Sequence, residues 1–504
     1  MSRSRAAIAG VASAGIALGA GELTAAVLSG PGPSPVSAVG TEFIDRYAAS
    51  LKDLAVEIFG TNDKPALIVG IVVTSLALGA VIGLAARRWW PIAPIGFVAF
   101  GCLGGWALST DPLGTTSTAV LSAVVAIAGG IASLVWLWRL AAMEPEPAGP
   151  ALQRRQFLAV SGGVVLIAAT SGVLSRRLRD PGSVDSARRS TTLPRPVNST
   201  PPPSTQPFSV AGLSPFVTSN DDFFRIDTAL TRPRVDADEW HLGVDGLVER
   251  PFELSYDELL RLDSISETIT LQCVSNEVGG RLVGNAVWQG VALAALLDRA
   301  GVRRGATQIV GRSVDGFTAG FPTEVSTDGR IAMVAYAMNG EPLPVEHGYP
   351  ARLMIAGLYG YVSATKWLDR IELTTWEDFD GYWVPRGWSK EGPIKTASRI
   401  DVPRSSAELT AGPQTIAGVA WAPVRGIELV EVQIDDGPWQ MADLGRVPSD
   451  NTWVQWRLAW DATAGDHVVR VRATDGHGAT QTEEIARPAP NGATGWHTRR
   501  VRVR

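Results

Sequence analysis

The distribution of apolar residues divides the chain into two parts. Up to about residue 180 the sequence is rich in Ala, Gly, Val, Leu and Ile and carries few charges, whereas after about residue 208 it has the mixture of a soluble globular chain. A helix needs ~20 apolar residues to cross a bilayer. We predict five such spans, at Ala7–Leu28, Ala66–Ala86, Ile92–Leu108, Ser117–Leu140 and Phe157–Leu174. Residues 1–180 are therefore expected to form an all-α transmembrane region of about five helices.

Charges around these spans predict their orientation. Between the first two spans, Glu42–Phe59 carries apolar residues at helical spacing and is expected to lie along the membrane surface. With five spans, most flanking arginines fall on one side, which the positive-inside rule makes cytoplasmic; they are Arg3, Arg5, Arg87, Arg88, Arg139, Arg154 and Arg155. Arg176, Arg177 and Arg179 fall on the other side and oppose the rule. The prediction is a multi-pass protein of the cell membrane, with everything after residue 180 outside the cytoplasm.

The pair Arg154-Arg155 allows a second interpretation. With the following Gln156-Phe157-Leu158 and an apolar run, it resembles a twin-arginine export signal, a type that exports folded, cofactor-loaded domains. The alternative is an ordinary pair of arginines flanking a span.

A change of composition separates the membrane region from the soluble part. Residues 181–208 contain Leu193-Pro194-Arg195-Pro196 and three consecutive prolines from Pro201, which favours an extended linker. Residues 209–398 mix strands with short helices and predict an α+β domain. There, Ser255 and Glu258 form a capping box that begins a helix, Val291–Ala300 is a second helix that Gly301 ends, and Ala332–Met338 and Ala351–Ala356 are buried strands.

Period-2 alternation dominates the last hundred residues. Val430, Val432 and Ile434 alternate with polar residues ahead of an Asp-Gly turn, and Val469, Val471 and Ala473 repeat the pattern. For residues 399–504 this favours an all-β sandwich of immunoglobulin-like type without a disulfide.

Composition excludes several functions. The net charge is −5 and no basic stripe occurs, so a nucleic-acid partner is not expected. No CxxC or CxxCH motif occurs, which argues against thiol redox chemistry, zinc ribbons and c-type haem. All five histidines follow residue 240, so the spans cannot hold a haem through axial histidines.

Cys273 is the only cysteine of the polar part; the other, Cys102, lies in a predicted span. Cys273 ends a period-2 strand that runs into a loop with Gly279 and Gly280, and it shares a face with Ile269 and Leu271. A thiol held inward at that point can be inert packing, a nucleophile or a metal ligand.

Four segments together resemble the sulfite oxidase family of molybdopterin-dependent oxidoreductases. They are SNDDFFR from Ser219, the loop that begins at Cys273, YAMNGEPLP from Tyr336 with His347-Gly348, and GLYGY from Gly357 running to Lys366-Trp367-Leu368. The resemblance implies that residues 209–398 are a molybdopterin-binding catalytic domain of α+β fold, and that residues 399–504 are the immunoglobulin-like dimerisation domain of many members. It covers none of the membrane region.

The resemblance also implies roles for particular residues. Cys273 matches the single thiolate ligand of a molybdenum ion held by a pyranopterin dithiolene, and a soft thiolate suits such a site. Arg225 matches an arginine near the oxyanion substrate. The positions that would hold the cofactor are Asn220, Phe223, Cys273, His347, Arg352, Ala364, Thr365 and Lys366. The family's further arginine, five residues after the cysteine, is replaced by Val278; Arg281 lies nearby, and Phe317 falls in the region of the family's active-site tyrosine.

The predicted function is oxygen-atom transfer on a small oxo-substrate, sulfite-like or an S- or N-oxide, outside the cytoplasm. The predicted cofactors are molybdenum and molybdopterin. Electrons would be exchanged with a separate haem or quinone-linked partner, the lipid bilayer would hold the first region, and the β domain could form a homodimer. Two alternatives stay open: a thiol hydrolase that uses Cys273 with His347, and a non-enzymatic membrane receptor with a vestigial pterin fold.

Overall fold

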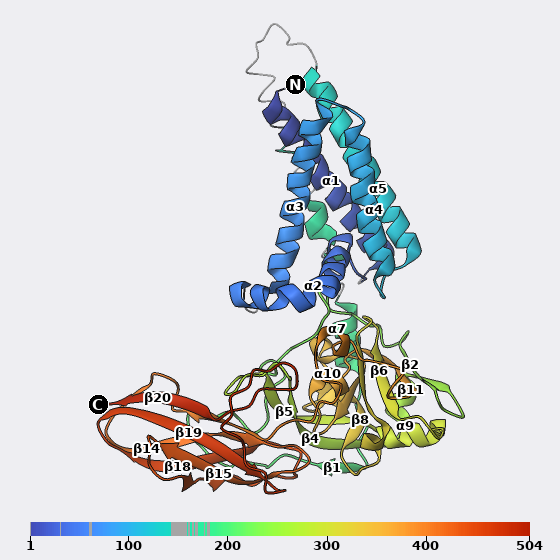
Figure 1. The fold of residues 1–504 in the computed structure, drawn as a ribbon. Helices are drawn as coiled ribbons and strands as arrows, with labels where there is room; N and C mark the ends of the chain where they lie inside the picture. The colour runs from blue at the N-terminus through green and yellow to red at the C-terminus, as the bar shows by residue number, and fades with distance from the viewer. Residues whose placement is uncertain are drawn as a thin grey trace. The chain divides into compact units, whose positions relative to one another are not determined.

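A computed structural model describes residues 2–30, 32–59, 63–142 and 182–504, together with scattered residues between 159 and 178. The chain forms two compact units (Figure 1). The first comprises Met1–Ser183 and the short segment Thr228–Arg234, and the second comprises Val184–Asp227 and Val235–Arg504.

The first unit is helical. Its long helices are α1 (Arg3–Ser29), α2 (Pro35–Phe59), α3 (Asp63–Ala86), α4 (Ile92–Thr110) and α5 (Thr116–Ala142). Helices α1, α3, α4 and α5 are long and apolar enough to cross a membrane. They match the first four predicted spans, and α2 includes the predicted surface helix Glu42–Phe59. Half of the fifth predicted span, Phe157–Leu174, and the whole pair Arg154-Arg155 lie outside the described residues.

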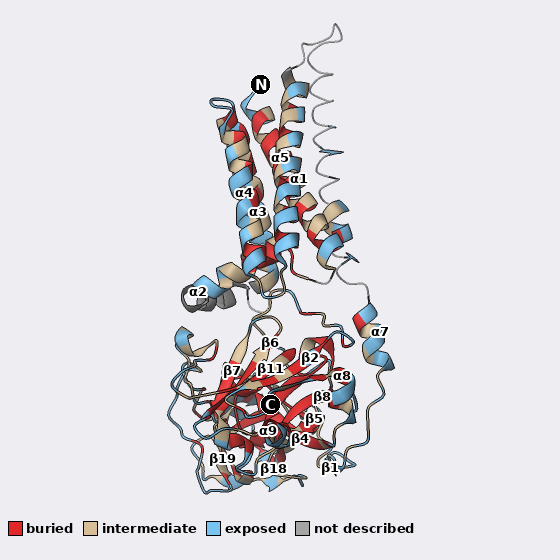
Figure 2. Cartoon of the chain, turned by 90° about the vertical axis from the view of Figure 1, so that its right-hand side faces the viewer, coloured by how far each residue is buried: buried red, intermediate tan, exposed pale blue. Residues whose placement is uncertain are grey.

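Apolar side chains remain exposed on these helices. Val69, Val81 and Ile95 are each about 60% exposed, and Figure 2 shows exposed and intermediate positions along α3, α4 and α5. Glycine allows the backbones to meet: a Cβ on Gly10 of α1 would lie 2.0 Å from the Gly79 carbonyl oxygen of α3. Exposed apolar faces and close contacts between small residues are typical of helices packed in lipid.

The second unit begins with an α+β part of two sheets. One sheet has the strand order β1 (Asn198–Thr200), β4 (Ser264–Gln272), β5 (Val283–Ala292), β8 (Ala332–Met338) and β10 (Arg352–Ile355), with β9 (Glu341–Pro342) paired to β8. The other has the order β3 (Phe252–Ser255), β2 (His241–Gly246), β11 (Leu368–Thr374), β6 (Gln308–Ser313) and β7 (Thr318–Pro322). The α-helices of this unit are α7 (Ser183–Ser190), which starts at the unit boundary, α8 (Tyr256–Arg261), α9 (Leu293–Ala300) and α10 (Gly360–Ser363). The 3-10 helices are η2 (Thr323–Ser326), η3 (Val345–His347) and η4 (Val384–Arg386).

Local sequence signals explain these elements. Ser255 accepts the Glu258 N–H and Glu258 reaches back to the Ser255 N–H, so the predicted capping box begins α8. Gly301 adopts a left-handed conformation and ends α9, as predicted. The predicted strand Ala332–Met338 is β8, and every one of its residues is buried.

The stretch 181–208, which we predicted to be an extended linker, contains ordered structure. It includes α7, and its strand β1 pairs in parallel with β4, with Ser199 opposite Ser266. Thr200 also donates a hydrogen bond to Glu267 at 2.9 Å. The proline-rich composition hid this strand because its partner lies more than sixty residues further along the chain.

The C-terminal part consists of two sheets. The first sheet has the strand order β12 (Ala397–Val402), β14 (Gly412–Trp421), β18 (Val454–Ala462) and β17 (Asp443–Leu444). The second sheet has the order β13 (Glu408–Leu409), β20 (His497–Val503), β19 (Gly465–Asp475), β15 (Ile427–Ile434) and β16 (Gln440–Met441). Both predicted alternating strands are present as β15 and β19. Val430, Val432, Val469 and Val471 are fully buried and join residues of the first sheet in one core.

Hydrogen bonds join the C-terminal part to strand β4. The Trp421 indole N–H donates to the Gln272 side-chain oxygen at 2.7 Å, and the Trp453 backbone N–H donates to the Thr270 hydroxyl at 2.7 Å. Both tryptophans are buried in an apolar cluster that also contains Val274. The strand that leads to Cys273 is therefore held from both domains.

Candidate active site

Cys273 lies directly after β4 and is buried, with 8% of its surface exposed. Its backbone N–H donates to the Leu282 carbonyl at 2.9 Å, and its carbonyl accepts the Asn276 N–H at 3.0 Å. The Asn276 side chain accepts the Leu282 N–H at 2.8 Å, which closes the loop. We call residues 273–282 the Cys273 loop. These bonds fix the position of the thiol without using the sulfur.

The C-terminal part anchors this loop. Arg399 donates to the Gly280 carbonyl at 2.8 Å and pairs with Asp401 at 2.7 Å. Gly279 has a φ of +76°, and a Cβ there would lie 2.2 Å from the His497 ring. The loop therefore requires glycine at that position. Burial lowers the pKa of His497 to about 4, so this imidazole is neutral near pH 7.

Tyr359 is the tyrosine that the structure associates with Cys273. Burial raises the pKa of Tyr359 to about 12, and the electrostatic influence of Cys273 acts in the same direction. Its hydroxyl therefore stays protonated. We singled out the segment around Tyr359 in the sequence and expected Phe317 in the region of the active-site tyrosine; the Phe317 ring lies 5.7 Å from the ring of Tyr382.

A cavity of about 340 Å³ lies between the Cys273 loop and the C-terminal part. From the loop side it is lined by Gln272, Asn276, Glu277, Val278 and Gly279, and from the C-terminal side by residues that include Lys395, Arg425 and Asp475. The Arg425 guanidinium pairs with Asp475 at 2.8 Å. Lys395 instead donates to two neutral oxygens, the Asn491 side chain at 3.1 Å and the Gly492 carbonyl at 2.7 Å. Its positive charge is thus not matched by a carboxylate in the described part of the chain.

A second group of site residues gathers around Arg352, the first residue of β10. We call Asn220, Phe223, Trp288, His347 and Arg352 the Arg352 cluster. The guanidinium lies over the Trp288 ring, 5.0 Å from its centre, and donates to the His347 carbonyl at 3.0 Å. The His347 ring bonds the Asn220 carbonyl at 2.9 Å and meets the Phe223 ring edge to face at 5.6 Å.

The Arg352 cluster holds a buried positive charge. Arg352 is only 4% exposed, its guanidinium bonds carbonyl oxygens alone, and no ion pair to it occurs among the described residues. Burial lowers its pKa to about 9, which leaves it charged near pH 7. Burial also lowers the pKa of His347 to about 4, so the neighbouring imidazole is neutral. A buried cation without a counter-charge is costly, and an anionic ligand would relieve that cost.

Ala364, Thr365 and Lys366 lie beside this cluster. Arg352 donates to the Ala364 carbonyl at 3.3 Å, and the Thr365 carbonyl accepts the Leu353 N–H at 2.9 Å. The Ala364 N–H is bonded to Gly360, so it is not free to hold a phosphate. Lys366 donates to the Glu346 carbonyl at 3.1 Å and pairs with Asp227 at 2.7 Å.

Phe223 connects the cluster to the strands that carry the Cys273 loop. A Cβ on Gly284 of β5 would lie 2.7 Å from the Phe223 ring, and Gly284 pairs with Leu271 of β4. Arg225, two residues after Phe223, is exposed. The structure thus gathers six of the predicted residues around Arg352, and Phe223 packs on the strand that pairs with β4 just ahead of Cys273.

The arrangement limits the chemistry. The described residues contain no group of three or more His, Cys, Asp and Glu side chains that could hold a metal ion. A metal at Cys273 would therefore need ligands that the described chain does not supply. The hydrolase alternative gains no support, because the His347 Nε2 atom is bonded to the Asn220 carbonyl.

Comparison with known proteins finds similarity to molybdopterin-dependent oxidoreductases. Residues 229–383 match the family described as the oxidoreductase molybdopterin binding domain. The uncharacterized oxidoreductase YuiH of Bacillus subtilis (strain 168) is 34% identical over 157 residues, which cover 31% of this chain and 76% of that protein.

Two further matches cover more than half of the chain. Mitochondrial sulfite oxidase of Homo sapiens is 28% identical over 342 residues, and the match covers 58% of this chain and 61% of that protein. The crystal structure of the sulfane dehydrogenase SoxCD from Paracoccus pantotrophus superposes with a TM-score of 0.50 at 24% identity, covering 57% of this chain and 81% of that one. The latter similarity concerns the fold.

Proposed function

This chain belongs to the sulfite oxidase family of molybdopterin oxidoreductases, and on that basis we propose that it transfers an oxygen atom to or from a small oxo-substrate at a molybdenum centre bound through Cys273. The observation that carries the proposal is the buried Arg352 guanidinium, which has only carbonyl partners. A phosphorylated cofactor would supply the missing negative charge.

The residues present fit such a cofactor. Arg352 would hold its phosphate. Asn220 would position the residues around it, because its side-chain oxygen accepts the Asn339 amide at 2.8 Å and its carbonyl bonds the neutral His347 ring at 2.9 Å. Cys273 would be the one protein ligand of the metal, since no cluster of further ligands lies in the described chain. When bound, the cofactor supplies the two-electron redox change and the exchangeable oxygen. The Lys366–Asp227 pair would hold the neighbouring turn in place.

We assign the substrate path to the cavity beside the Cys273 loop. Val278 lines it where the family carries an arginine, and Lys395 places a positive charge in the same cavity from the C-terminal side. A cation attracts an oxyanion more strongly where water is partly excluded. Burial lowers the pKa of Lys395. Exposed Arg225 would act further out, by drawing anions towards the site.

The four apolar helices would anchor the enzyme in the cell membrane. Arg3, Arg5, Arg87, Arg88 and Arg139 fall at one side if α1, α3, α4 and α5 cross in turn, and the positive-inside rule makes that side cytoplasmic. One further crossing before residue 182 would place the catalytic unit outside the cytoplasm. We also infer an immunoglobulin-like C-terminal domain, with a separate haem or quinone-linked protein exchanging electrons; this domain could mediate a homodimer.

Elemental analysis of the purified full chain, produced in cells that make the cofactor, tests the proposal. We expect about one molybdenum and one pterin per chain, with turnover of sulfite or of an S- or N-oxide using an artificial electron carrier. Replacing Lys395 by Met should raise KM for an anionic substrate about tenfold with little change in kcat. Protein that folds but contains neither metal nor pterin would contradict the assignment.

A further inference from the structure

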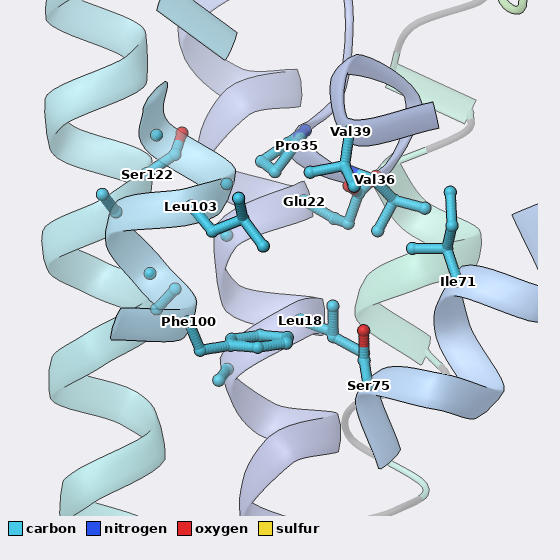
Figure 3. A pocket seen from close by; sticks show the side chains of 17 residues that line it. Leu18, Glu22, Pro35, Val36, Val39, Ile71, Ser75, Phe100, Leu103 and Ser122 are labelled. Carbon is cyan, nitrogen blue, oxygen red and sulfur yellow. The ribbon is translucent and has the colours of Figure 1, made fainter. Parts of the chain in front are cut away.

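The membrane unit contains a cavity that the catalytic reaction does not use. It is partly open, has a volume of about 70 Å³ and is lined by all four apolar helices and the start of α2 (Figure 3). Its wall is formed almost entirely by Ala, Gly, Val, Leu, Ile, Pro and Phe side chains. Three polar side chains interrupt this wall: Glu22, Ser75 and Ser122. Figure 3 shows Ser122 and Ser75 on opposite sides, with Glu22 between them.

The Ser122 hydroxyl is the observation that indicates a ligand in this cavity. Ser122 is 1% exposed, and its Oγ has no hydrogen-bond partner in the described chain. A serine in an apolar helix usually satisfies its hydroxyl by bonding a carbonyl of its own helix. Ser133 on the same helix does so, because its hydroxyl donates to the Gly129 carbonyl at 2.7 Å. An unsatisfied hydroxyl in an apolar medium costs free energy that a ligand oxygen would recover. Glu22 lies in the same cavity and accepts the Val36 N–H at 3.0 Å.

The lining selects the chemical class of that ligand. No Lys, Arg or His contributes to the described lining, so the cavity offers no cation to an anionic phosphate headgroup. A neutral lipophile whose hydroxyl groups can donate to a carboxylate and also accept from a serine fits the three polar groups. The Phe100 ring on α4 adds an aromatic surface to the same wall.

We propose that this cavity binds the hydroxylated ring of a lipid-soluble quinol. The choice of a quinol over other hydroxylated lipids rests on the proposed function, because oxygen-atom transfer exchanges two electrons with a partner. All five histidines of the chain follow residue 240, so the described helices cannot offer a histidine-ligated haem for that exchange. A whole benzene ring occupies a cavity of about 150 Å³. The smaller cavity here therefore takes the hydroxylated edge of the ring, while the remainder and its isoprenoid tail lie in lipid.

Calorimetric titration of the detergent-solubilised full chain with a decyl-substituted 1,4-benzoquinol tests this site. Saturable binding is expected, and it should weaken about fivefold in Ser122→Ala, the loss typical of one hydrogen bond. Ser122→Thr should restore it because the hydroxyl returns. Ser133→Ala is the matched control, since that hydroxyl bonds its own helix, and it should bind like the wild type. Glu22→Gln should also weaken binding.

Two outcomes would overturn the site: no saturable binding by wild-type protein, or equal affinities in Ser122→Ala and Ser133→Ala. Displacement of the quinol by a non-aromatic diacylglycerol at equal concentration would also overturn the assignment to quinols. Cys273→Ser separates this proposal from the catalytic one, because it should bind the quinol normally even where oxygen-atom transfer is lost. If the wild-type protein binds the quinol but shows no turnover, the catalytic proposal is contradicted and the quinol site is not.

Discussion

The Cys273 loop and the Arg352 cluster satisfy their polar groups in different ways. The loop obtains its partners from the C-terminal part, where Arg399 bonds Gly280 and Trp421 bonds Gln272. Arg352 of the cluster obtains its partners from the α+β part alone, and no carboxylate of the described residues pairs with its charge. The loop thus depends on a second domain, whereas the cluster, on the function that we propose, would depend on a ligand. Metal position and cofactor retention should accordingly be separable by mutation.

Replacing Cys273 by Ser should have the largest effect. The substitution removes the soft thiolate ligand but leaves the Arg352 cluster intact, so turnover should fall more than a hundredfold while the pterin content stays near that of the wild type. Assays of turnover, molybdenum and pterin on one preparation would show this. Cys102→Ser is the matched control, because Cys102 is an exposed residue of α4. Normal turnover by the Cys273 variant would rule out the ligand assignment.

Replacing Arg352 by Met should give the opposite pattern, with loss of the cofactor itself. Methionine fills similar space without charge, so the pterin content should fall about tenfold while the purified chain remains folded by circular dichroism. Arg370→Met is the control, since Arg370 forms a partly exposed pair with Asp245 in the same part of the molecule. Full pterin content in the Arg352 variant would show that the cluster does not hold the cofactor.

Replacing Arg399 by Gln should loosen the loop without emptying the cluster. Arg399 and Asp401 are both more than 90% buried, and removal of one partner from a buried pair costs about 3 kcal/mol. We expect lower unfolding stability in urea and about tenfold lower turnover per bound molybdenum. Arg457→Gln breaks the exposed pair with Asp443 on the same sheet and should cost less than about 0.5 kcal/mol. Equal costs in the two variants would contradict the anchoring role.

The smallest effect is a dependence of stability on pH that both regions share. His347 and His497 titrate at 6.5 when exposed, and burial lowers the pKa of each to about 4 in the folded chain. The unfolded state therefore binds more protons between pH 6.5 and 4, so stability falls as pH falls through this window, by at most about 3 kcal/mol for each histidine.

Urea unfolding at pH 7 and 4.5 would measure this loss. His347→Gln and His497→Gln should each reduce the loss of stability on going from pH 7 to 4.5, and the double variant should lack both contributions. Burial raises the pKa of Asp369 to about 6, and this carboxyl acts in the opposite direction in all of these proteins. Asp475 does not interfere: burial alone would raise its pKa, but hydrogen bonds from Thr396 and Arg425 outweigh burial and hold it at about 2. A pH response unchanged in the double variant would refute the assignment.

Local patterns predicted many elements of the fold but few of these long-range contacts. The run Ala332–Met338 is a strand because every residue is apolar and buried, and the capping box at Ser255 requires only four residues. The residues around Arg352 were predicted from the family resemblance. Lys395, Arg399 and His497 were missed, because each reaches the site from more than a hundred positions away and lies in an ordinary polar–apolar alternation.

The solitary charge of Arg352 also bears on how the protein matures. A newly made chain that has not yet acquired its prosthetic group carries a desolvated guanidinium in its interior, so it should open more readily than a finished molecule. Proteases that recognise opened chains would then remove immature copies first. One arginine could in this way let the cell retain completed enzymes and recycle the others.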